Sequence, residues 1–421
     1  MSTKKHANLT PSLIEYCFNH PSQVVFETTE KCNLACRYCT FRELYSHKHA
    51  RGLDRLISMD INTADILLDY YLNLWKHKNY SQKEVYVSFY GGEPLMNFGL
   101  IKHVVEKIVK QENELHIIPI FSMTTNATLL ERNLEFFVNH KFRLLISLDG
   151  DFEGNSLRVF GNNKANSFSS VFNTALKIKK EFPDYYKENV SFNAVLHNKN
   201  GLDKLILFFE KELEKEPLFS PISDIEINEN FKEEFESMQI SFQQATQEAT
   251  EECAQKLWDK YMHNNPYVTQ LTSHIFNNSG NVYKDLNSLM LGESIKEGAF
   301  PSGTCLPFTK KVFLTARGLI LPCERISHNN CLGRIENNHL EISFEQIANI
   351  YNGYYKKLSS QCVRCDYKQA CLHCVFQDDQ FRESGKCISF STNKKVEELY
   401  KQILLSHPSI YQRIMNETVI K

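Results

Sequence analysis

The stretch SQVVFETTEKCNLACRYC, residues 22–39, joins a short apolar run to three closely spaced cysteines. The run at 22–28 predicts a β-strand, and Cys32, Cys36 and Cys39 follow it in the pattern C-x3-C-x2-C. A structural zinc site requires four ligands and usually takes C-x2-C pairs, whereas this loop offers three thiols. Three thiolates can hold a four-iron cluster and leave one iron without a protein ligand. The stretch therefore predicts a metal-binding loop at the end of a strand.

Strands and helices alternate along the chain after this loop. Helices are predicted at 61–77, 98–112, 129–139, 168–182 and 202–215, and strands at 84–90, 116–123, 142–148, 189–196 and 223–228. A βα pattern repeated about six times predicts a parallel sheet. The periodicity does not distinguish a closed barrel from an open sheet, but in both the ligands bind at the C-terminal ends of the strands.

Polar motifs follow three of these strands where they end. Gly91-Gly92-Glu93 follows the second strand, Asn126 the third, and Ser147 begins a Ser-Leu-Asp-Gly stretch at the end of the fourth, with Arg158 shortly after. Glycines let a backbone approach a ligand closely, and a carboxylate beside them can accept hydrogen bonds from an ammonium group. The strand ends therefore form the expected binding edge.

The three-cysteine loop with its tyrosine, C-x3-C-x-Y-C, and the Gly-Gly-Glu motif resemble the radical S-adenosylmethionine (SAM) superfamily. The resemblance implies an α/β fold, a partial (β/α)6 TIM-type barrel over residues 15–228. It implies that Cys32, Cys36 and Cys39 hold a 4Fe-4S cluster, that its open iron binds SAM, and that reductive cleavage gives a 5′-deoxyadenosyl radical. The implied SAM contacts are Tyr38, Gly91, Gly92, Glu93, Asn126, Ser147 and Arg158. Two departures are Ala127, where glycine is common, and the lack of a His–Asp pair before Arg158.

Eight further cysteines lie between Cys305 and Cys387, whereas Cys17 and Cys253 stand alone as expected packing residues. Their spacing resembles the SPASM domain found behind some radical SAM domains, with one interval shorter by a residue. The resemblance implies two auxiliary 4Fe-4S clusters. One would use Cys362, Cys365, Cys371 and Cys387, and the other Cys305, Cys323 and Cys374, with Cys331 as the nearest candidate for a fourth ligand. Zinc-ribbon sites are the alternative that C-x2-C pairs alone allow.

The remaining domain boundaries follow from composition. Residues 229–300 break the βα rhythm and predict a helical insertion, 301–391 the cysteine-rich SPASM domain with few helices or long strands, and 392–421 a C-terminal helix. Residues 210–252 carry 13 acidic residues and three lysines, which is either a solvated face or a docking surface for a basic peptide segment.

Several classes of protein are excluded. Basic residues number 48 and acidic residues 50, so the net charge of −2 argues against a nucleic-acid binder. No stretch approaches the 18 apolar residues of a membrane span, and the N-terminus lacks a secretory signal, which predicts a cytoplasmic protein. Thiols stay reduced there, so 13 cysteines indicate metal rather than disulfides.

The combined resemblance predicts a peptide maturase that oxidatively modifies, and most simply crosslinks, a ribosomally made precursor peptide or protein. An electron donor such as flavodoxin or ferredoxin is implied. An anaerobic sulfatase-maturating enzyme that forms formylglycine is the alternative, and a non-catalytic iron–sulfur or zinc scaffold is the alternative of another class. Either chemistry needs a general base, and the candidates at strand ends are Glu27, Asp149 and Glu226.

Overall fold

The computed structural model covers the chain in segments. The residues it describes are 9–45, 56–78, 80, 84–224, 227–259, 268, 271–272, 275, 304–367, 371, 373–377, 381, 384–392, 395–407, 409–411 and 414. Within them, no helix is both long enough and apolar enough to cross a membrane.

The chain divides into two compact units. The barrel unit comprises Tyr16–Ala254 and Pro307–Ser343, and the cysteine-rich unit comprises Met1–Glu15, Gln255–Leu306 and Phe344–Lys421. The boundary predicted at residue 301 thus does not coincide with the division between the units, because residues 307–343 belong to the barrel unit.

The barrel unit contains a ten-stranded sheet of order β10-β9-β8-β7-β1-β2-β3-β4-β5-β6. Strands β1 to β6 pair in parallel, β7 lies parallel to the other side of β1, and β7 to β10 continue as antiparallel hairpins. The strand bounds are β1 (Gln23–Thr29), β2 (Glu84–Gly91), β3 (Ile118–Thr125), β4 (Arg143–Ser147), β5 (Val190–Leu196), β6 (Leu218–Pro221), β7 (Val312–Leu314), β8 (Leu319–Leu321), β9 (Gly333–Glu336) and β10 (His339–Ile342).

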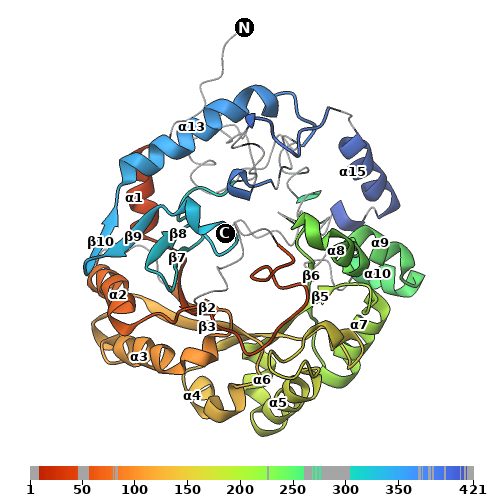
Figure 1. Cartoon of the computed structure of the whole chain (residues 1–421), viewed down its shortest axis with the longest axis horizontal. Helices are drawn as coiled ribbons and strands as arrows, with labels where there is room; N and C mark the ends of the chain where they lie inside the picture. The colour runs from red at the N-terminus through yellow and green to blue at the C-terminus, as the bar shows by residue number, and fades with distance from the viewer. Residues whose placement is uncertain are drawn as a thin grey trace. The chain divides into compact units, whose positions relative to one another are not determined.

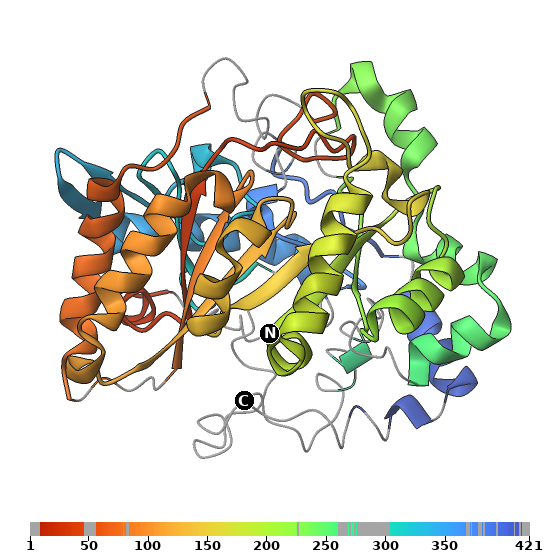
Figure 2. The same cartoon turned by 90° about the horizontal axis from the view of Figure 1, so that it is seen from below.

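Helices follow the strands and run around the outside of the sheet (Figures 1 and 2). Their bounds are α2 (Ile61–Trp75), α3 (Phe98–Val109), α4 (Leu134–Asn139), α5 (Phe168–Glu181), α6 (Pro183–Asn189) and α7 (Leu202–Phe208). Alternate strand residues such as Val87 and Phe89 are buried beneath them, and the Phe89 and Phe142 rings lie 5.9 Å apart. Because β1 to β6 are parallel, their C-terminal ends lie at the same edge of the sheet, and this arrangement confirms the predicted partial-barrel class.

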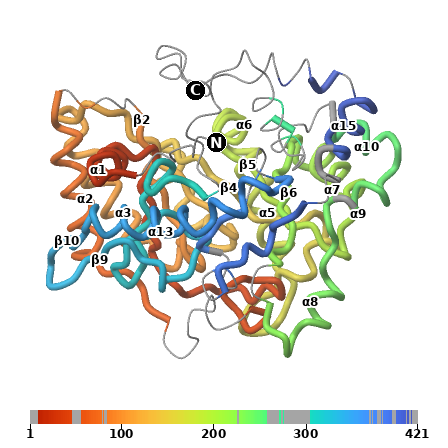
Figure 3. Tube along the Cα trace, turned by 90° about the horizontal axis from the view of Figure 1, so that it is seen from above, coloured from red at the N-terminus to blue at the C-terminus, as the bar shows by residue number. Residues whose placement is uncertain are grey.

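Two sequence predictions for the elements are wrong. The sixth strand is Leu218–Pro221 rather than 223–228, because Pro221 ends the ladder and Ile227 instead bridges to Tyr45. The 19-residue helix α13 (Phe344–Cys362) lies where few helices were expected (Figure 3). Its buried stripe of Ile347, Tyr351, Tyr355 and Leu358 has helical spacing, but poor helix formers surround it.

The other helices agree with the predicted pattern. Residues 229–259 are helical in α8 (Lys232–Met238), α9 (Phe242–Glu248) and α10 (Glu251–Asp259), and most of the predicted insertion after them lies outside the described residues. The chain also forms α1 (Pro11–Asn19) and, as expected near the C-terminus, α15 (Lys395–Ser406).

Candidate active site

The three-cysteine loop begins where β1 ends, at the C-terminal edge of the sheet. The segment after β4 holds its backbone: Ala35 N donates to Val159 O at 2.6 Å, and Arg37 N donates to Leu157 O at 3.0 Å. Cys36 is buried, Cys39 is half-buried and Cys32 is exposed. The loop is therefore ordered by main-chain bonds before any ligand is considered.

The two glycines at the end of β2 leave room for the backbone that leads into this loop. A Cβ at Gly92 would lie 2.3 Å from Lys31 O, and one at Gly91, where φ is +150°, would lie 2.3 Å from Thr29 O. Gly92 N and Glu93 N donate to Thr29 O and Lys31 O, each at 2.8 Å. No side chain larger than hydrogen fits there, so the glycines bring the Gly-Gly-Glu motif against the loop.

Glu93 joins the ends of β2 and β3 beside Cys32. Its carboxylate accepts Thr125 Oγ1 at 2.7 Å, Asn126 N at 2.8 Å and Leu95 N at 3.2 Å, and the residue is 1% exposed. Burial raises the pKa of Glu93 to about 7, although these hydrogen bonds lower it. A buried carboxylate of this kind is suited to bind an ammonium group, which would restore its charge.

Asn126 lies directly against the loop. Its Nδ2 lies 3.0 Å from Asn33 Oδ1 and 3.8 Å from Cys32 Sγ. The next residue, Ala127, has a φ of +58°, in the left-handed region that favours glycine. Ala127 thus stands where the resemblance leads us to expect glycine, and the left-handed backbone at this position explains why glycine is common there.

Asp149, the residue after the Ser147-Leu148 end of β4, is fully buried and contacts Tyr38 and Arg158. The Tyr38 hydroxyl donates to Asp149 Oδ2, and Arg158 Nε lies 3.0 Å from the same oxygen. Burial alone would raise the pKa of Asp149, but the charge of Arg158, the nearby His197 ring and the hydrogen bond from Tyr38 lower it below its usual value. Ser147 is half-buried at the strand end.

Helix α8 of the predicted insertion covers the cysteine loop. Phe235 and Met238 of α8 belong to one apolar cluster with Cys36, Tyr38 and other loop residues. Arg37 Nη1 lies 3.6 Å from Glu234 Oε1 on the same helix. The start of the insertion is thus part of the site, a placement that the sequence pattern did not reveal because these contacts are distant along the chain.

The candidate bases differ in their surroundings. Glu27 is fully buried and accepts Ala316 N at 2.9 Å, next to Glu30, which binds Arg317 through Nε at 2.7 Å and Nη2 at 2.9 Å. These two carboxylates tie the end of β1 to the β7–β8 turn. Glu226 lies outside the described residues.

The residues of the loop fit an iron–sulfur cluster. Leu34 N donates to Cys32 Sγ at 3.4 Å and Arg158 Nη1 to Cys36 Sγ at 3.9 Å, and N–H donors to sulfur are the surroundings that cluster thiolates use. Among the residues described, no three His, Cys, Asp or Glu side chains are arranged to hold a single metal ion. The grouping of thiols therefore rests on spacing, hydrogen bonds and electrostatic neighbours.

The cysteine-rich unit gathers four of the predicted auxiliary ligands at the end of α13. Burial, together with the charges of Cys371, Cys387 and Cys365, raises the pKa of Cys362 to about 12, so the four thiols are electrostatic neighbours. Gln361 fixes the last of them: its Oε1 accepts Cys387 N at 3.0 Å, and its Nε2 donates to Gly385 O at 2.6 Å. Sequence analysis did not single out Gln361.

The second predicted auxiliary set is divided. Cys305 and Cys374 belong to the cysteine-rich unit, where Val375 N donates to Thr304 Oγ1 at 2.9 Å. Burial raises the pKa of Tyr355 above its usual value, and the charges of both cysteines add to this shift. Cys323 and Cys331 belong to the barrel unit. The structure thus brings together one half of this set and leaves the whole set a prediction.

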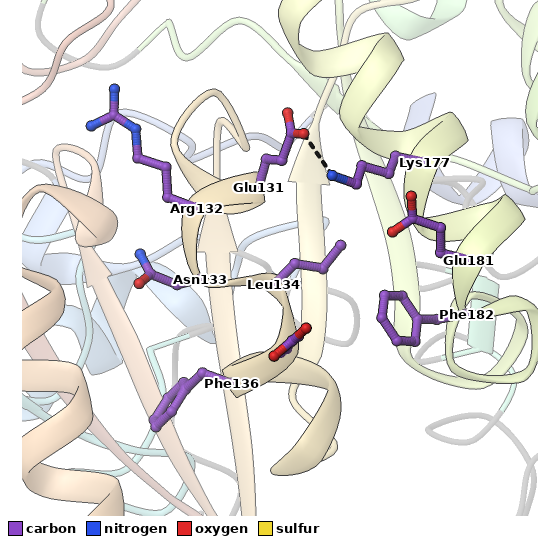
Figure 4. Close-up of a pocket in the computed structure, with 9 residues that line it drawn as sticks. Glu131, Arg132, Asn133, Leu134, Phe136, Lys177, Glu181 and Phe182 are labelled. Carbon is purple, nitrogen blue, oxygen red and sulfur yellow. Dashed lines mark hydrogen bonds and ion pairs between the residues drawn. The ribbon is translucent and has the colours of Figure 1, made fainter.

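A hollow of about 480 Å³ lies elsewhere, between residues 131–136 and helix α5 (Figure 4). Its rim carries an ion pair of 2.7 Å between Lys177 Nζ and Glu131 Oε1. It is formed by helices rather than by strand ends and is lined by none of the predicted site residues, so it is not part of the candidate active site.

Comparisons with known proteins match the part of the chain that contains this site. The model of the radical SAM superfamily matches residues 26–210. The chain is 25% identical over 209 residues to a cysteine-type anaerobic sulfatase-maturating enzyme of Clostridium novyi, covering 48% of this chain and 52% of that protein. It is 28% identical over 170 residues to the radical SAM cyclopropyl synthase TigE of Paramaledivibacter caminithermalis, covering 40% and 34%. The chain thus spans about half the length, or less, of these curated relatives.

The fold also resembles a solved structure. Native anSMEcpe with bound AdoMet and Kp18Cys peptide superposes with a TM-score of 0.61 at 17% identity, over 94% of this chain and 99% of that one. At this level of identity the likeness concerns the fold.

Proposed function

We propose that this chain, whose residues 26–210 match the model of the radical SAM superfamily, is a radical SAM peptide maturase that oxidatively modifies a ribosomally made peptide or protein. The observation that carries the proposal is the placement of Cys32, Cys36 and Cys39 against Gly91-Gly92-Glu93 at the C-terminal edge of a parallel sheet. A cluster on these thiols would supply the electron that cleaves SAM reductively.

The residues of the chain have separate tasks in this proposal. Glu93 would bind the amino group of SAM, because its buried carboxylate lies beside Cys32 and gains its charge when a cation arrives. Asn126 fixes the loop next to it, and Ser147 at the end of β4 would contact SAM from the neighbouring strand. Helix α8 excludes water from the buried side of the loop through Phe235 and Met238.

The peptide substrate rests on three lines of support. The similar proteins are a sulfatase-maturating enzyme and a cyclopropyl synthase, and the superposed structure contains a peptide. The second line is the SPASM-like cysteine pattern, which we propose forms two auxiliary clusters, and the third is the gathering of Cys362, Cys365, Cys371 and Cys387 in the cysteine-rich unit. Flavodoxin or ferredoxin would supply electrons.

Mass spectrometry of a co-expressed peptide tests this proposal. The full chain is expressed anaerobically with a short reading frame encoded beside it, and the peptide is fragmented. We expect loss of two hydrogens, localised to a linked pair of residues, with wild type and with Cys17→Ala, a cysteine outside the predicted clusters. Cys32→Ala should leave the mass unchanged, and modification by that variant would contradict the assignment.

The sulfatase-maturating function is the second candidate, because that relative gives the longer of the two alignments described above. A co-expressed sulfatase distinguishes the two. Conversion of its active-site cysteine or serine to formylglycine, without any change in the short peptide, would favour this second function over crosslinking.

A further inference from the structure

Asp149 is the centre of a buried polar network behind the cysteine loop. Its Oδ1 accepts Val195 N at 2.9 Å, while its Oδ2 accepts the Tyr38 hydroxyl and lies 3.0 Å from Arg158 Nε. His197 Nε2 lies 3.8 Å from the same Oδ2, and His197 Nδ1 accepts Lys199 N at 3.1 Å. Because Nδ1 accepts this hydrogen bond, Nε2 is the ring nitrogen that carries a hydrogen toward Asp149.

Arg158 connects this network to a predicted cluster ligand. Its Nη1 donates to Cys36 Sγ at 3.9 Å, its guanidinium carbon lies 5.4 Å from the centre of the Tyr38 ring, and its side chain is 9% exposed. The guanidinium therefore acts directly on the sulfur of Cys36.

The charge of Arg158 is already matched inside the protein. A buried cation is costly unless it is paired, and Asp149 provides that pair at Nε of the guanidinium. The Cys36 sulfur receives an N–H from Nη1, so one guanidinium pairs with Asp149 and donates to the sulfur at the same time. Hydrogen bonds to cluster sulfurs and local charge are what set cluster potentials.

We propose that Asp149 positions Arg158 to donate to the Cys36 sulfur, and that this contact raises the reduction potential of the cluster held by Cys32, Cys36 and Cys39. Reduction adds negative charge to the cluster, and a nearby guanidinium and its N–H stabilise that charge. Asp149 is thus the positioning residue, and Arg158 acts on the cluster ligand in place of the SAM contact that the resemblance implies for it. The inference rests on the proposed function, because it requires that the cluster be present.

A redox titration without SAM tests the effect on potential. The titration follows the electron paramagnetic resonance signal of the reduced cluster held by Cys32, Cys36 and Cys39. This signal is identified by its absence in Cys32→Ala. At a fixed potential, Arg158→Gln should lower the ratio of reduced to oxidised cluster about tenfold. For one electron this corresponds to a midpoint potential about 59 mV lower. Arg37→Gln is the matched control, because it removes the same charge from a neighbour of Cys36 whose side chain is 64% exposed; its midpoint should stay near that of wild type.

SAM affinity separates the two roles of Arg158. We expect Arg158→Gln to bind SAM with nearly wild-type affinity in the oxidised state, whereas Ser147→Ala should weaken SAM binding and leave the potential unchanged. A wild-type potential in Arg158→Gln, together with a tenfold loss of SAM affinity, would overturn the inference and return Arg158 to the SAM carboxylate.

A spectroscopic measurement covers the case in which Arg158→Gln does not fold and also tests Asp149. With 15N-labelled arginine, the reduced wild-type cluster should show a 15N coupling that Arg158→Lys lacks and Asp149→Asn weakens. No arginine coupling in wild type, or an unchanged coupling in Asp149→Asn, would refute the proposed contact. Absence of any Cys32-dependent signal in wild type would instead be a failure of the proposed function itself.

Discussion

Glu93 is the residue whose ionisation the structure ties most closely to SAM binding. Burial raises its pKa from 4.5 to about 7 in the ligand-free chain. A carboxyl with a raised pKa favours the folded state fully below pH 4.5, and that contribution is lost as the pH rises to about 7. Binding of an ammonium group reverses this preference for the protonated carboxyl, because the cation pairs with the ionised form of Glu93.

SAM affinity should therefore depend on pH. Below pH 7 the carboxyl of Glu93 in the free site is protonated, so binding of the SAM ammonium must release a proton. SAM affinity should therefore fall by up to about tenfold for each pH unit below 7. Equilibrium dialysis of the cluster-loaded, oxidised protein measures this. Glu93→Gln should bind more weakly at neutral pH and lose the dependence, and a variant that kept the wild-type slope would show that another group titrates.

Gly92 provides a second test at the scale of one residue. In Gly92→Ala the new Cβ would meet Lys31 O at 2.3 Å, so either β2 or the cysteine loop must move. We expect a loss of about 1–3 kcal/mol in local stability and at least about tenfold less SAM cleavage.

Gly99→Ala is the matched control for that variant. A Cβ at Gly99 meets nothing within 4 Å, and alanine is the better helix former in α3. It should be neutral or slightly stabilising in thermal unfolding and in SAM cleavage. Equal behaviour of the two variants would mean that the close approach at Gly92 has no consequence.

At the scale of elements, helix α8 covers the cysteine loop. Phe235 is 9% exposed within the apolar cluster that contains Cys36 and Tyr38. Phe235→Ala should cost about 3 kcal/mol and open the loop to solvent, so the cluster should bleach several-fold faster in air. The decay of the cluster absorbance at visible wavelengths measures the bleaching rate. Phe152→Ala is the control, because Phe152 is 61% exposed. Identical decay rates would mean that α8 does not shield the loop.

The end of helix α13 should control one auxiliary cluster. Gln361→Ala removes both hydrogen bonds to the 385–387 segment and frees Cys387. We expect about four fewer irons per chain, with SAM cleavage retained and product formation lost. Lys357→Ala, an exposed change on the same helix, should keep all iron. Full iron content in Gln361→Ala would contradict the assigned cluster.

For the molecule as a whole, the parallel βα order and the binding edge could be predicted from sequence, because strands such as 84–90 and the motifs that end them are local patterns. The cysteine loop and the Gly-Gly-Glu motif could be paired because both follow parallel strands. Helix α13 could not be predicted from sequence, because Asn352, Gly353 and Ser359 are poor helix formers. Only the packing of Tyr351 and Tyr355 favours this helix. The Arg158–Asp149–Cys36 contact also depends on tertiary packing.

The central claim is that the loop of Cys32, Cys36 and Cys39 carries out reductive SAM cleavage. The most direct measurement is 5′-deoxyadenosine formed from SAM with dithionite by anaerobically reconstituted full-length protein. We predict turnover by wild type and by Cys17→Ala and none by Cys32→Ala. Equal 5′-deoxyadenosine formation by Cys32→Ala, or none by an iron-loaded wild type, would contradict the account.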